Sequence, residues 1–230
     1  MGAVIIGLLR RTVRFRNRLT LASCNLAAVF FLSTPSIAQE ITIAALGDSL
    51  TQGYGLKAED GFVPQLDAWL NAQGRDVDLL NAGVSGDTTA GGKSRIDWTL
   101  TEDVDALIVA LGGNDLLRGI DPDVSRDNLT AILEAAESKG VPVLLAGIEA
   151  PGNYGPEYKA AFDGIFVELA ARYNAVFYEN FLAGLTINED RVTAVRKYMQ
   201  ADGIHPNPDG VSQIVADIGP KVLELLDRVE

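Results

Sequence analysis

The sequence predicts a single α/β domain, built on a parallel sheet with helices on both sides. Short apolar runs alternate with amphipathic stretches along the chain after residue 38, and strand alternating with helix is typical of a parallel sheet. The run at residues 104–111 is nearly continuous in apolar character, which favours a strand covered on both faces. Roughly 190 residues can bury a substantial core without a metal or a disulfide. No internal repeat or interdomain linker divides them.

Each element is predicted from its own stretch of sequence. Apolar runs are expected to form strands at residues 41–46, 77–80, 104–111, 141–148 and 175–178. Apolar residues at helical spacing predict helices between these strands, at residues 62–73, 88–100, 124–139 and 158–173. A last helix is expected to run to about residue 228, with Asn207 as its N-cap and Pro208 at its first helical position.

Residues 1–38 differ from the rest of the chain and are expected to form a signal peptide. They contain five arginines and no acidic residue, and an apolar stretch at residues 19–32 precedes a small-residue end at Ala38. This layout is typical of a secretory signal peptide, so cleavage is expected after Ala38. The domain would then occupy residues 39–230, and the protein would be exported to the periplasm or the medium.

Two other interpretations of this segment stay open. One is a retained membrane anchor, although polar residues interrupt the apolar stretch, which is short for a spanning helix. The other is a lipoprotein signal at residues 21–24, although the apolar segment continues after Cys24. Cleavage after Ala38 would leave no stable membrane insertion. It would also remove Cys24, the only cysteine, so the exported domain would contain no disulfide.

The net charge argues against several kinds of partner. It is −12 for the whole chain and becomes −17 once residues 1–38, with their five arginines and no acidic residue, are removed. Such a surface repels nucleic acid and anionic lipid headgroups, so neither is expected as a partner. The chain has one histidine and no cysteine after residue 38, so no metal site is expected either. Nothing in the sequence indicates the oligomeric state.

The segment after the first predicted strand offers a candidate nucleophile. In open α/β sheets, ligands bind beyond the carboxyl ends of the strands, so chemistry is expected in the segments that follow them. Gly47-Asp48-Ser49-Leu50 follows the first strand, and Ser49 stands at the turn into a helix, where developing negative charge is favoured. The simpler alternative is that Asp48 or Ser49 is a helix N-cap.

The segments after the next two strands offer candidate hydrogen-bond donors. Gly86 lies in a turn after the second strand, where a glycine can bring a bare backbone N–H close to a ligand. Asn114 follows two glycines after the third strand and has an uncharged amide that donates at any working pH. Each has a structural alternative, an ordinary glycine turn for Gly86 and an Asx-turn for Asn114.

His205, the only histidine of the chain, is the candidate base. A serine hydroxyl is a weak nucleophile unless an adjacent base accepts its proton, and histidine is suited to that role near neutral pH. Asp202 lies three residues earlier in the same Gly/Pro-rich loop and can reach the other ring nitrogen, which would set the tautomer. A purely structural histidine is the alternative.

These four segments, in order, resemble the four sequence blocks of the SGNH/GDSL hydrolase family, and they span residues 39–230. The similarity is closest to the bacterial periplasmic thioesterase, lysophospholipase and arylesterase branch. It implies a flavodoxin-like, five-stranded parallel sheet in a three-layer α/β/α sandwich. It further implies Ser49 as nucleophile with Asp202 and His205, and an oxyanion hole of the Ser49 N–H, the Gly86 N–H and the Asn114 amide.

The expected function is therefore hydrolysis of small carboxylic esters or acyl thioesters through an acyl-enzyme, without a cofactor. The alternative is a module on the same fold that binds acyl or glycan ligands without turnover. Residues 87–94 approach a P-loop, but Asp87 stands where its first glycine belongs, and no Gly-x-Ser-x-Gly elbow exists. Four apolar residues near the site could form an acyl-binding face or belong to the core: Leu116, Leu117, Ile120 and Tyr154.

Overall fold

A computed structural model describes Gly2 and residues 41–229. Residues 41–229 form a five-stranded parallel sheet whose strands lie in the order β2-β1-β3-β4-β5. This is the flavodoxin-like order that the family resemblance implies. The strands are β1 (Ile41–Gly47), β2 (Val77–Gly83), β3 (Ala106–Ala110), β4 (Val143–Ala146) and β5 (Val176–Tyr178).

The register of the three central strands brings their carboxyl ends together. Gly47, the last residue of β1, pairs with Gly83 at the end of β2 and with Ala110 at the end of β3. The chain passes from β1 to β2 on one side and later to β3 on the other, so β1 lies at the topological switch point, where such folds bind ligands. The segments that begin after these three residues therefore meet at one edge of the sheet.

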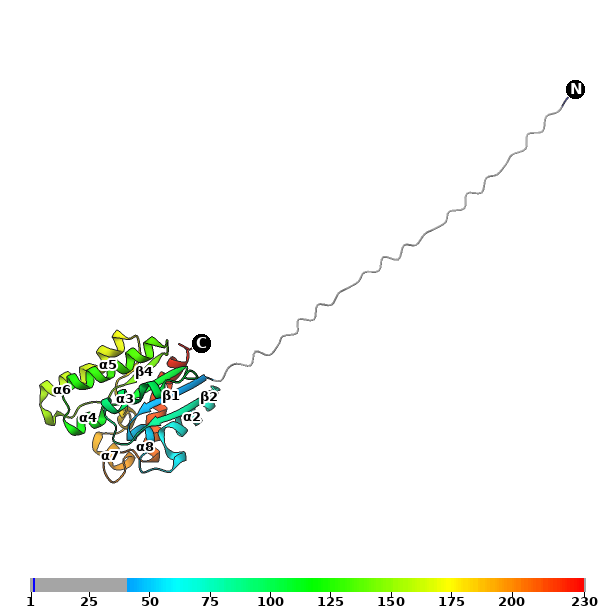
Figure 1. The fold of residues 1–230 in the computed structure, drawn as a ribbon. Coiled ribbons are helices and arrows are strands. Elements are labelled where there is room, and N and C mark those ends of the chain that lie inside the picture. Colours follow the sequence, from blue (N-terminus) through cyan, green and yellow to red (C-terminus); the bar gives the residue numbers. More distant parts are fainter. Residues whose placement is uncertain (1, 3–40, 230) are drawn as a thin grey trace. The chain divides into compact units, whose positions relative to one another are not determined.

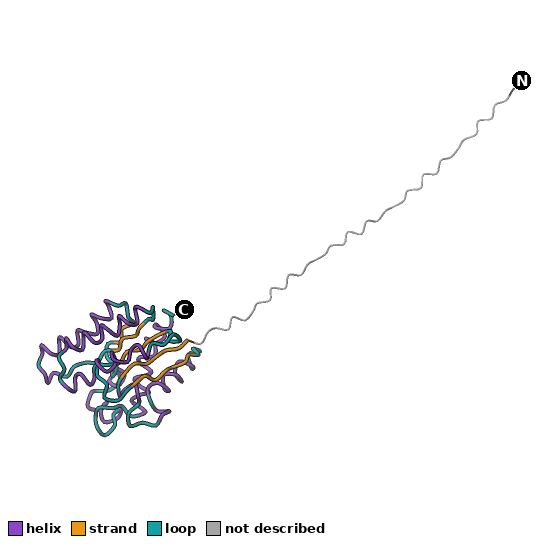
Figure 2. Tube along the Cα trace, viewed as in Figure 1, coloured by secondary structure: helices purple, strands orange, loops and turns teal. Residues whose placement is uncertain are grey.

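Helices cover both faces of the sheet (Figures 1 and 2), with α2 and α8 on one face and α3, α5 and α6 on the other. The main helices are α2 (Phe62–Ala72), α3 (Thr89–Thr99), α5 (Pro122–Ser138), α6 (Pro156–Arg172) and α8 (Pro208–Leu226). The shorter ones are α1 (Ser49–Gln52), α4 (Gly113–Arg118) and α7 (Arg191–Tyr198). Three short 3₁₀ segments are η1 (Ala58–Asp60), η2 (Gly152–Tyr154) and η3 (Ala183–Thr186).

The core consists of two apolar layers, one on each face of the sheet. Alternate side chains of β1 divide between them: Ile43 packs in the layer under α2 and α8, whereas Leu46 packs in the layer under α3, α5 and α6. All five residues of β3 are buried, which confirms the prediction of a strand covered on both faces. Side chains of β1 are therefore packed on both faces, up to the turn that leaves the strand.

Element types agree with the predictions, but several bounds differ. The predicted strand at 104–111 begins only at Ala106, and β2 runs three residues past the predicted end, to Gly83. The predicted helix at 124–139 begins at Pro122, because the Asp121 side chain accepts the Asp123 N–H as an N-cap. Asn207 caps α8 as predicted, with its Oδ1 accepting the Gly210 N–H at 2.9 Å.

The helix expected after the first strand is present as α1, although it has only four residues. The short helices α4 and α7 were not among the predicted elements, because a stretch of six to eight residues holds too few turns for helical spacing to be recognised. In the described part of the chain, no helix combines the length and the apolar character that a membrane span requires. Apart from Gly2, the predicted signal peptide lies outside the described residues and stays a prediction.

Candidate active site

Ser49 and His205 lie in hydrogen-bonding contact although 156 residues separate them in the sequence. The Ser49 Oγ is 2.9 Å from the His205 Nε2. Ser49 is the first residue of α1, directly after the sharp exit from β1. That exit needs a glycine, since a Cβ on Gly47 would lie 1.9 Å from the Thr51 Oγ1. Because α1 has only four residues, its dipole adds little at Ser49.

Asp202 holds the other nitrogen of the imidazole. Its Oδ2 lies 2.7 Å from the His205 Nδ1, while its Oδ1 accepts the backbone N–H groups of Ile204 and His205 at 2.9 and 3.0 Å. The hydrogen bond from the His205 ring is the main reason that the pKa of Asp202 falls to about 2, and the two backbone N–H groups lower it further. An ionised carboxylate only accepts hydrogen bonds, so Nδ1 carries the proton and Nε2 faces Ser49 as an acceptor.

Hydrogen bonds hold the loop that carries His205 at both of its ends. The Gln200 backbone N–H donates to the His205 carbonyl at 2.8 Å, and the Gln200 side chain donates to the carbonyls of Tyr54 and Pro206. At the other end, the Asn207 amide donates to the Lys197 carbonyl at 2.8 Å. The backbone around His205 is thereby connected to α7 and to the segment after α1.

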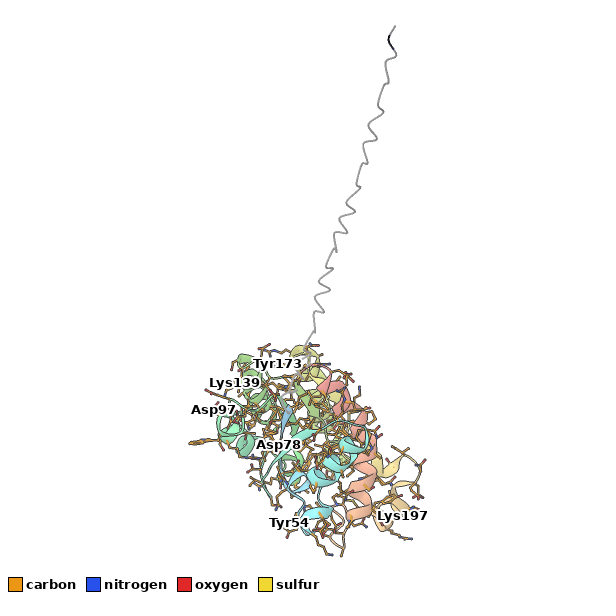
Figure 3. The ribbon with its side chains drawn as sticks, turned by 90° about the vertical axis from the view of Figure 1, so that its right-hand side faces the viewer. Tyr54, Asp78, Asp97, Lys139, Tyr173 and Lys197 are labelled. Atoms are coloured by element: carbon orange, nitrogen blue, oxygen red, sulfur yellow. The ribbon has the colours of Figure 1, made fainter. Side chains whose placement is uncertain are left out.

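Tyr54 lies against the imidazole, a contact that the sequence did not indicate. Its ring centroid is 4.7 Å from that of His205, and the two planes are tilted by 40°. Figure 3 places Tyr54 and Lys197 at one end of the domain, away from Tyr173 and Lys139. No motif marks Tyr54 as a site residue, because its contact with His205 arises only when the last loop returns to the end of β1.

The segment around Gly86 follows β2 and is fixed by an arginine. Gly86 has a φ of +84°, so the expected glycine turn exists, and it does not exclude a donor role for the Gly86 N–H. Arg95 on α3 donates to the Asp87 carboxylate at 2.7 Å, to the Ala82 carbonyl at 2.7 Å and to the Gly47 carbonyl at 2.9 Å. One planar guanidinium therefore connects the ends of β1 and β2 with the Gly86 turn.

Asn114 lies in α4, and its side chain contacts the two other segments of the site. Its Nδ2 donates to the Asp87 carbonyl at 2.9 Å and to the Asp48 Oδ2 at 3.3 Å. Those partners lie 66 and 27 residues away in the sequence, respectively for Asp48 and Asp87. An Asx-turn would instead be a local bond between the Asn114 side chain and the backbone just after it, so the structure does not support that interpretation. The amide nitrogen thus faces both the Gly86 turn and the residue before Ser49. Among residues 41–229, these are the hydrogen bonds found for the Asn114 side chain.

Asp48 is the N-cap of α1 and is also a buried acid beside the site. Its Oδ1 accepts the Leu50 N–H at 3.0 Å, which is the capping role considered for it from the sequence. Only 3% of Asp48 is exposed. Burial raises its pKa to about 6, against the opposing effects of the Leu50 N–H, His205 and the Asn114 amide. Its charge state therefore changes within the range in which enzymes work.

The four candidate acyl-face residues divide between core and surface. Leu116 is buried and packs in the core, whereas Leu117 and Tyr154 are exposed. Tyr154 packs over Gly119, where a Cβ would approach the Tyr154 ring to 3.0 Å. Ile120 is half-buried, and its carbonyl accepts the Tyr158 hydroxyl at 2.8 Å.

Comparison with known proteins places this chain in a family. Residues 45–212 match the GDSL-like Lipase/Acylhydrolase family. The chain is 37% identical to Esterase TesA of Pseudomonas aeruginosa, over 90% of this chain and 98% of that protein. It is 34% identical to Thioesterase 1/protease 1/lysophospholipase L1 of Escherichia coli K12, over 80% of this chain and 84% of that protein.

A solved structure is similar to this chain in both sequence and fold. The crystal structure of AlinE4, described as an SGNH-hydrolase family esterase, is 39% identical and superposes with a TM-score of 0.66, over 83% of this chain and 99% of that one. The family model covers more than half of the chain, and the two relatives are related over most of their length. The chain therefore belongs to the GDSL-like lipase/acylhydrolase family and is a hydrolase of the ester and thioester class.

Proposed function

We propose that Ser49 is the nucleophile of this hydrolase, with His205 as its base and Asp202 as the group that orients His205. The observation that carries the proposal is the continuous chain of contacts from the Asp202 carboxylate through both imidazole nitrogens to the Ser49 hydroxyl, at 2.7 and 2.9 Å. This chain of contacts has the hydrogen-bond pattern that an activated serine requires.

In this mechanism the Ser49 hydroxyl attacks the acyl carbonyl carbon while His205 Nε2 accepts its proton. The resulting imidazolium is stabilised by the ionised Asp202 and then donates the proton to the departing alcohol or thiol. Water adds to the acyl-enzyme in the same way, and the acid leaves as Ser49 regains its proton. The positive charge that forms on His205 lies beside the Tyr54 ring, where a cation–π attraction favours it.

The tetrahedral oxyanion is proposed to be held by three donors: the Ser49 N–H, the Gly86 N–H and the Asn114 amide. The Asn114 Nδ2 contacts the Asp87 carbonyl and, at the longer distance of 3.3 Å, the Asp48 carboxyl. Because the second contact is long, an oxyanion can replace it at small cost. A negative charge on Asp48 would compete for the same amide hydrogen.

The proposed substrates are small carboxylic esters and acyl thioesters. The relatives support both, since one is named an esterase and the other a thioesterase and lysophospholipase. Exposed Leu117 and Tyr154 offer apolar surface for an acyl or aryl group. A chain-length series of p-nitrophenyl esters and matched thioesters, assayed on residues 39–230, would rank the leaving groups and acyl lengths.

Substitution of the nucleophile and of the base tests the mechanism. Ser49→Ala and His205→Gln are each expected to lower kcat by about 10³-fold or more, while circular dichroism and thermal unfolding stay close to the original. Ser94→Ala is the matched control, because the Ser94 hydroxyl only donates to the Gly91 carbonyl on an exposed face of α3. Near-normal turnover by Ser49→Ala would contradict the assignment.

The same variants separate an enzyme from a binding module. An active-serine phosphonate probe is expected to label the original protein and Ser94→Ala, and to leave Ser49→Ala unlabelled. A protein that binds an acyl ligand but is labelled in none of these forms would support the binding alternative.

We further propose that the protein is exported and that residues 39–230 are the mature form. The arginine-rich, acid-free segment and the small-residue end at Ala38 support this. Expression of the full chain in a Gram-negative host, followed by periplasmic extraction and intact-mass measurement, is expected to give a mature chain that begins at Gln39. A full-length chain in the membrane fraction would contradict the proposal.

A further inference from the structure

Asp115 is a buried acid next to Asn114, and the mechanism above does not use it. Only 1% of Asp115 is exposed. Its carboxylate accepts three hydrogen bonds: from the Thr89 N–H at 2.9 Å, from the Thr89 hydroxyl at 2.6 Å and from the Ser125 hydroxyl at 2.9 Å. The Thr89 hydroxyl accepts in turn from the Asn128 amide at 3.2 Å, which completes a closed polar network between α3, α4 and α5.

This network joins three helices at a cost in free energy. Among the ion pairs of residues 41–229 none includes Asp115, and all three of its donors are uncharged. Burial of a carboxylate without a cation costs free energy, and well-packed apolar residues at such positions are often neutral or stabilising. Stability alone therefore does not account for an acid at this position. A precise geometric requirement does, because a carboxylate with several donors holds its partners in one arrangement.

Asp115 connects the two segments that carry Asn114 and Gly86. Asp115 is adjacent to Asn114 in α4, and Thr89 lies three residues after Gly86. The other links between α4 and residues 86–89 are the bond from Asn114 to the Asp87 carbonyl and an exposed one from the Arg118 guanidinium to the Gly86 carbonyl, at 2.7 Å. The two bonds between Asp115 and Thr89 are the fully buried links, so water does not compete for them.

The short helix α4 needs contacts outside itself to hold its orientation. With six residues, α4 cannot hold its own orientation by helix propensity. Its first turn rests on the aromatic core, where a Cβ on Gly112 would approach the Phe166 and Phe162 rings to 3.2 and 3.3 Å. That contact places α4 relative to α6, whereas its links to residues 86–89 come from Asp115, Asn114 and the exposed Arg118.

We infer that Asp115 is a positioning residue for the reaction: through Thr89 it holds the Gly86 turn against the helix that carries Asn114, so that two oxyanion donors from different segments keep a common geometry. The inference rests on the proposed oxyanion hole. A displacement of about 1 Å at a reacting centre can cost about 10²-fold in rate, so loss of this link acts on kcat rather than on substrate binding.

A matched pair of variants tests the inference without touching the carboxylate. Thr89→Val and Ser125→Ala each remove one uncharged hydroxyl donor from Asp115, but only Thr89 belongs to the segment that carries Gly86. At similar losses of thermal stability, Thr89→Val is expected to lower kcat for a p-nitrophenyl ester about 10-fold more than Ser125→Ala, with KM changed by less than about 3-fold. Thr89→Ser, which keeps the hydroxyl, is expected to restore kcat.

Asp115→Asn is the direct variant, and a boronic acid that forms a tetrahedral adduct on serine is the second readout. The affinity for the boronic acid is expected to weaken in parallel with kcat, because both depend on the oxyanion donors. Equal kcat in Thr89→Val and Ser125→Ala, or a kcat that follows the melting temperature alone, would overturn the inference. Failure of the proposed mechanism itself would be seen separately, as activity that survives Ser49→Ala.

Discussion

The pKa values of two aspartates at the site, Asp48 and Asp202, are shifted in opposite directions, and their surroundings explain why. Asp202 is partly exposed and receives a hydrogen bond from the His205 ring and two from backbone N–H groups, which lower its pKa to about 2. Asp48 is buried, and desolvation raises its pKa to about 6. Asp202 is thus an anion beside His205 throughout the working pH range, whereas the charge of Asp48 depends on pH.

Asp202→Asn tests the orienting role at the residue scale. An asparagine can donate to the imidazole, so it favours the tautomer in which Nε2 carries the proton and cannot accept from Ser49. We expect kcat to fall about 10³- to 10⁴-fold, as in other serine hydrolases that lose this acid. Asp190→Asn is the control, because Asp190 only caps α7 by accepting from Val192 and Thr193. A loss of less than about 10-fold in Asp202→Asn would reduce Asp202 to a loop-stabilising residue.

Asp48→Asn tests the raised pKa through stability. The folded-state pKa lies above the ordinary value of 3.8, so the folded protein retains a proton that the unfolded chain has released. The stabilisation from this proton is complete below pH 3.8 and is lost as the pH rises through about 6. Asparagine keeps the cap but has no charge to bury.

The free energy of unfolding of Asp48→Asn, relative to the original protein, is therefore expected to rise by about 1 kcal/mol between pH 5 and pH 8. Urea unfolding at both pH values measures this difference, and the contribution of Asp202 cancels because both proteins share it. A difference that does not change with pH would show that Asp48 has the same charge in both states over this range.

At the scale of elements, α8 does more than cover the sheet, because its N-cap also supports the loop that carries His205. The Asn207 Oδ1 accepts from the Gly210 N–H, while its amide nitrogen donates to the carbonyls of Lys197 and Met199 at 2.8 and 3.4 Å. One side chain therefore joins the start of α8 to the end of α7, on either side of the loop that carries His205.

Asn207→Ala is expected to cost about 1 kcal/mol in cap stability and to lower kcat as well, because the His205 loop loses one of its ties. Asp121→Ala removes an N-cap of the same kind from α5, where Asp121 accepts the Asp123 N–H away from the base. It is expected to lower stability by a similar amount with unchanged kcat. Urea unfolding and steady-state kinetics on the two variants separate the effects, and equal kcat in both would count against the supporting role.

At the scale of the whole molecule, the charge of −17 for residues 39–230 sets the long-range field that a substrate meets. An acyl-CoA is a polyanion, whereas a p-nitrophenyl ester is neutral. When ionic strength rises from about 20 mM to about 200 mM, kcat/KM for the acyl-CoA is expected to rise about 2- to 10-fold as the repulsion is screened, and that for the neutral ester is expected to stay constant.

A fall of kcat/KM for the acyl-CoA with added salt would point to a local cationic surface. In α7, Arg191 and Arg196 form no ion pair within residues 41–229, and a cationic patch there could attract an anionic substrate. If kcat/KM for the acyl-CoA falls as salt is added, the local field near α7 outweighs the net charge.

The sequence by itself determined the alternation of strands and helices, the buried central strand and the cap of α8, and it singled out the residues that we propose to react. Those features depend on neighbours in the chain, on apolar periodicity and on the presence of a single histidine. Only the tertiary structure decided that the His205 ring reaches Ser49, that the Tyr54 ring lies against it, that Asn114 faces Asp87 and Asp48, and that burial raises the pKa of Asp48 to about 6. Each of these depends on the order of strands in the sheet and on exclusion of water, which act through space between residues far apart in the sequence.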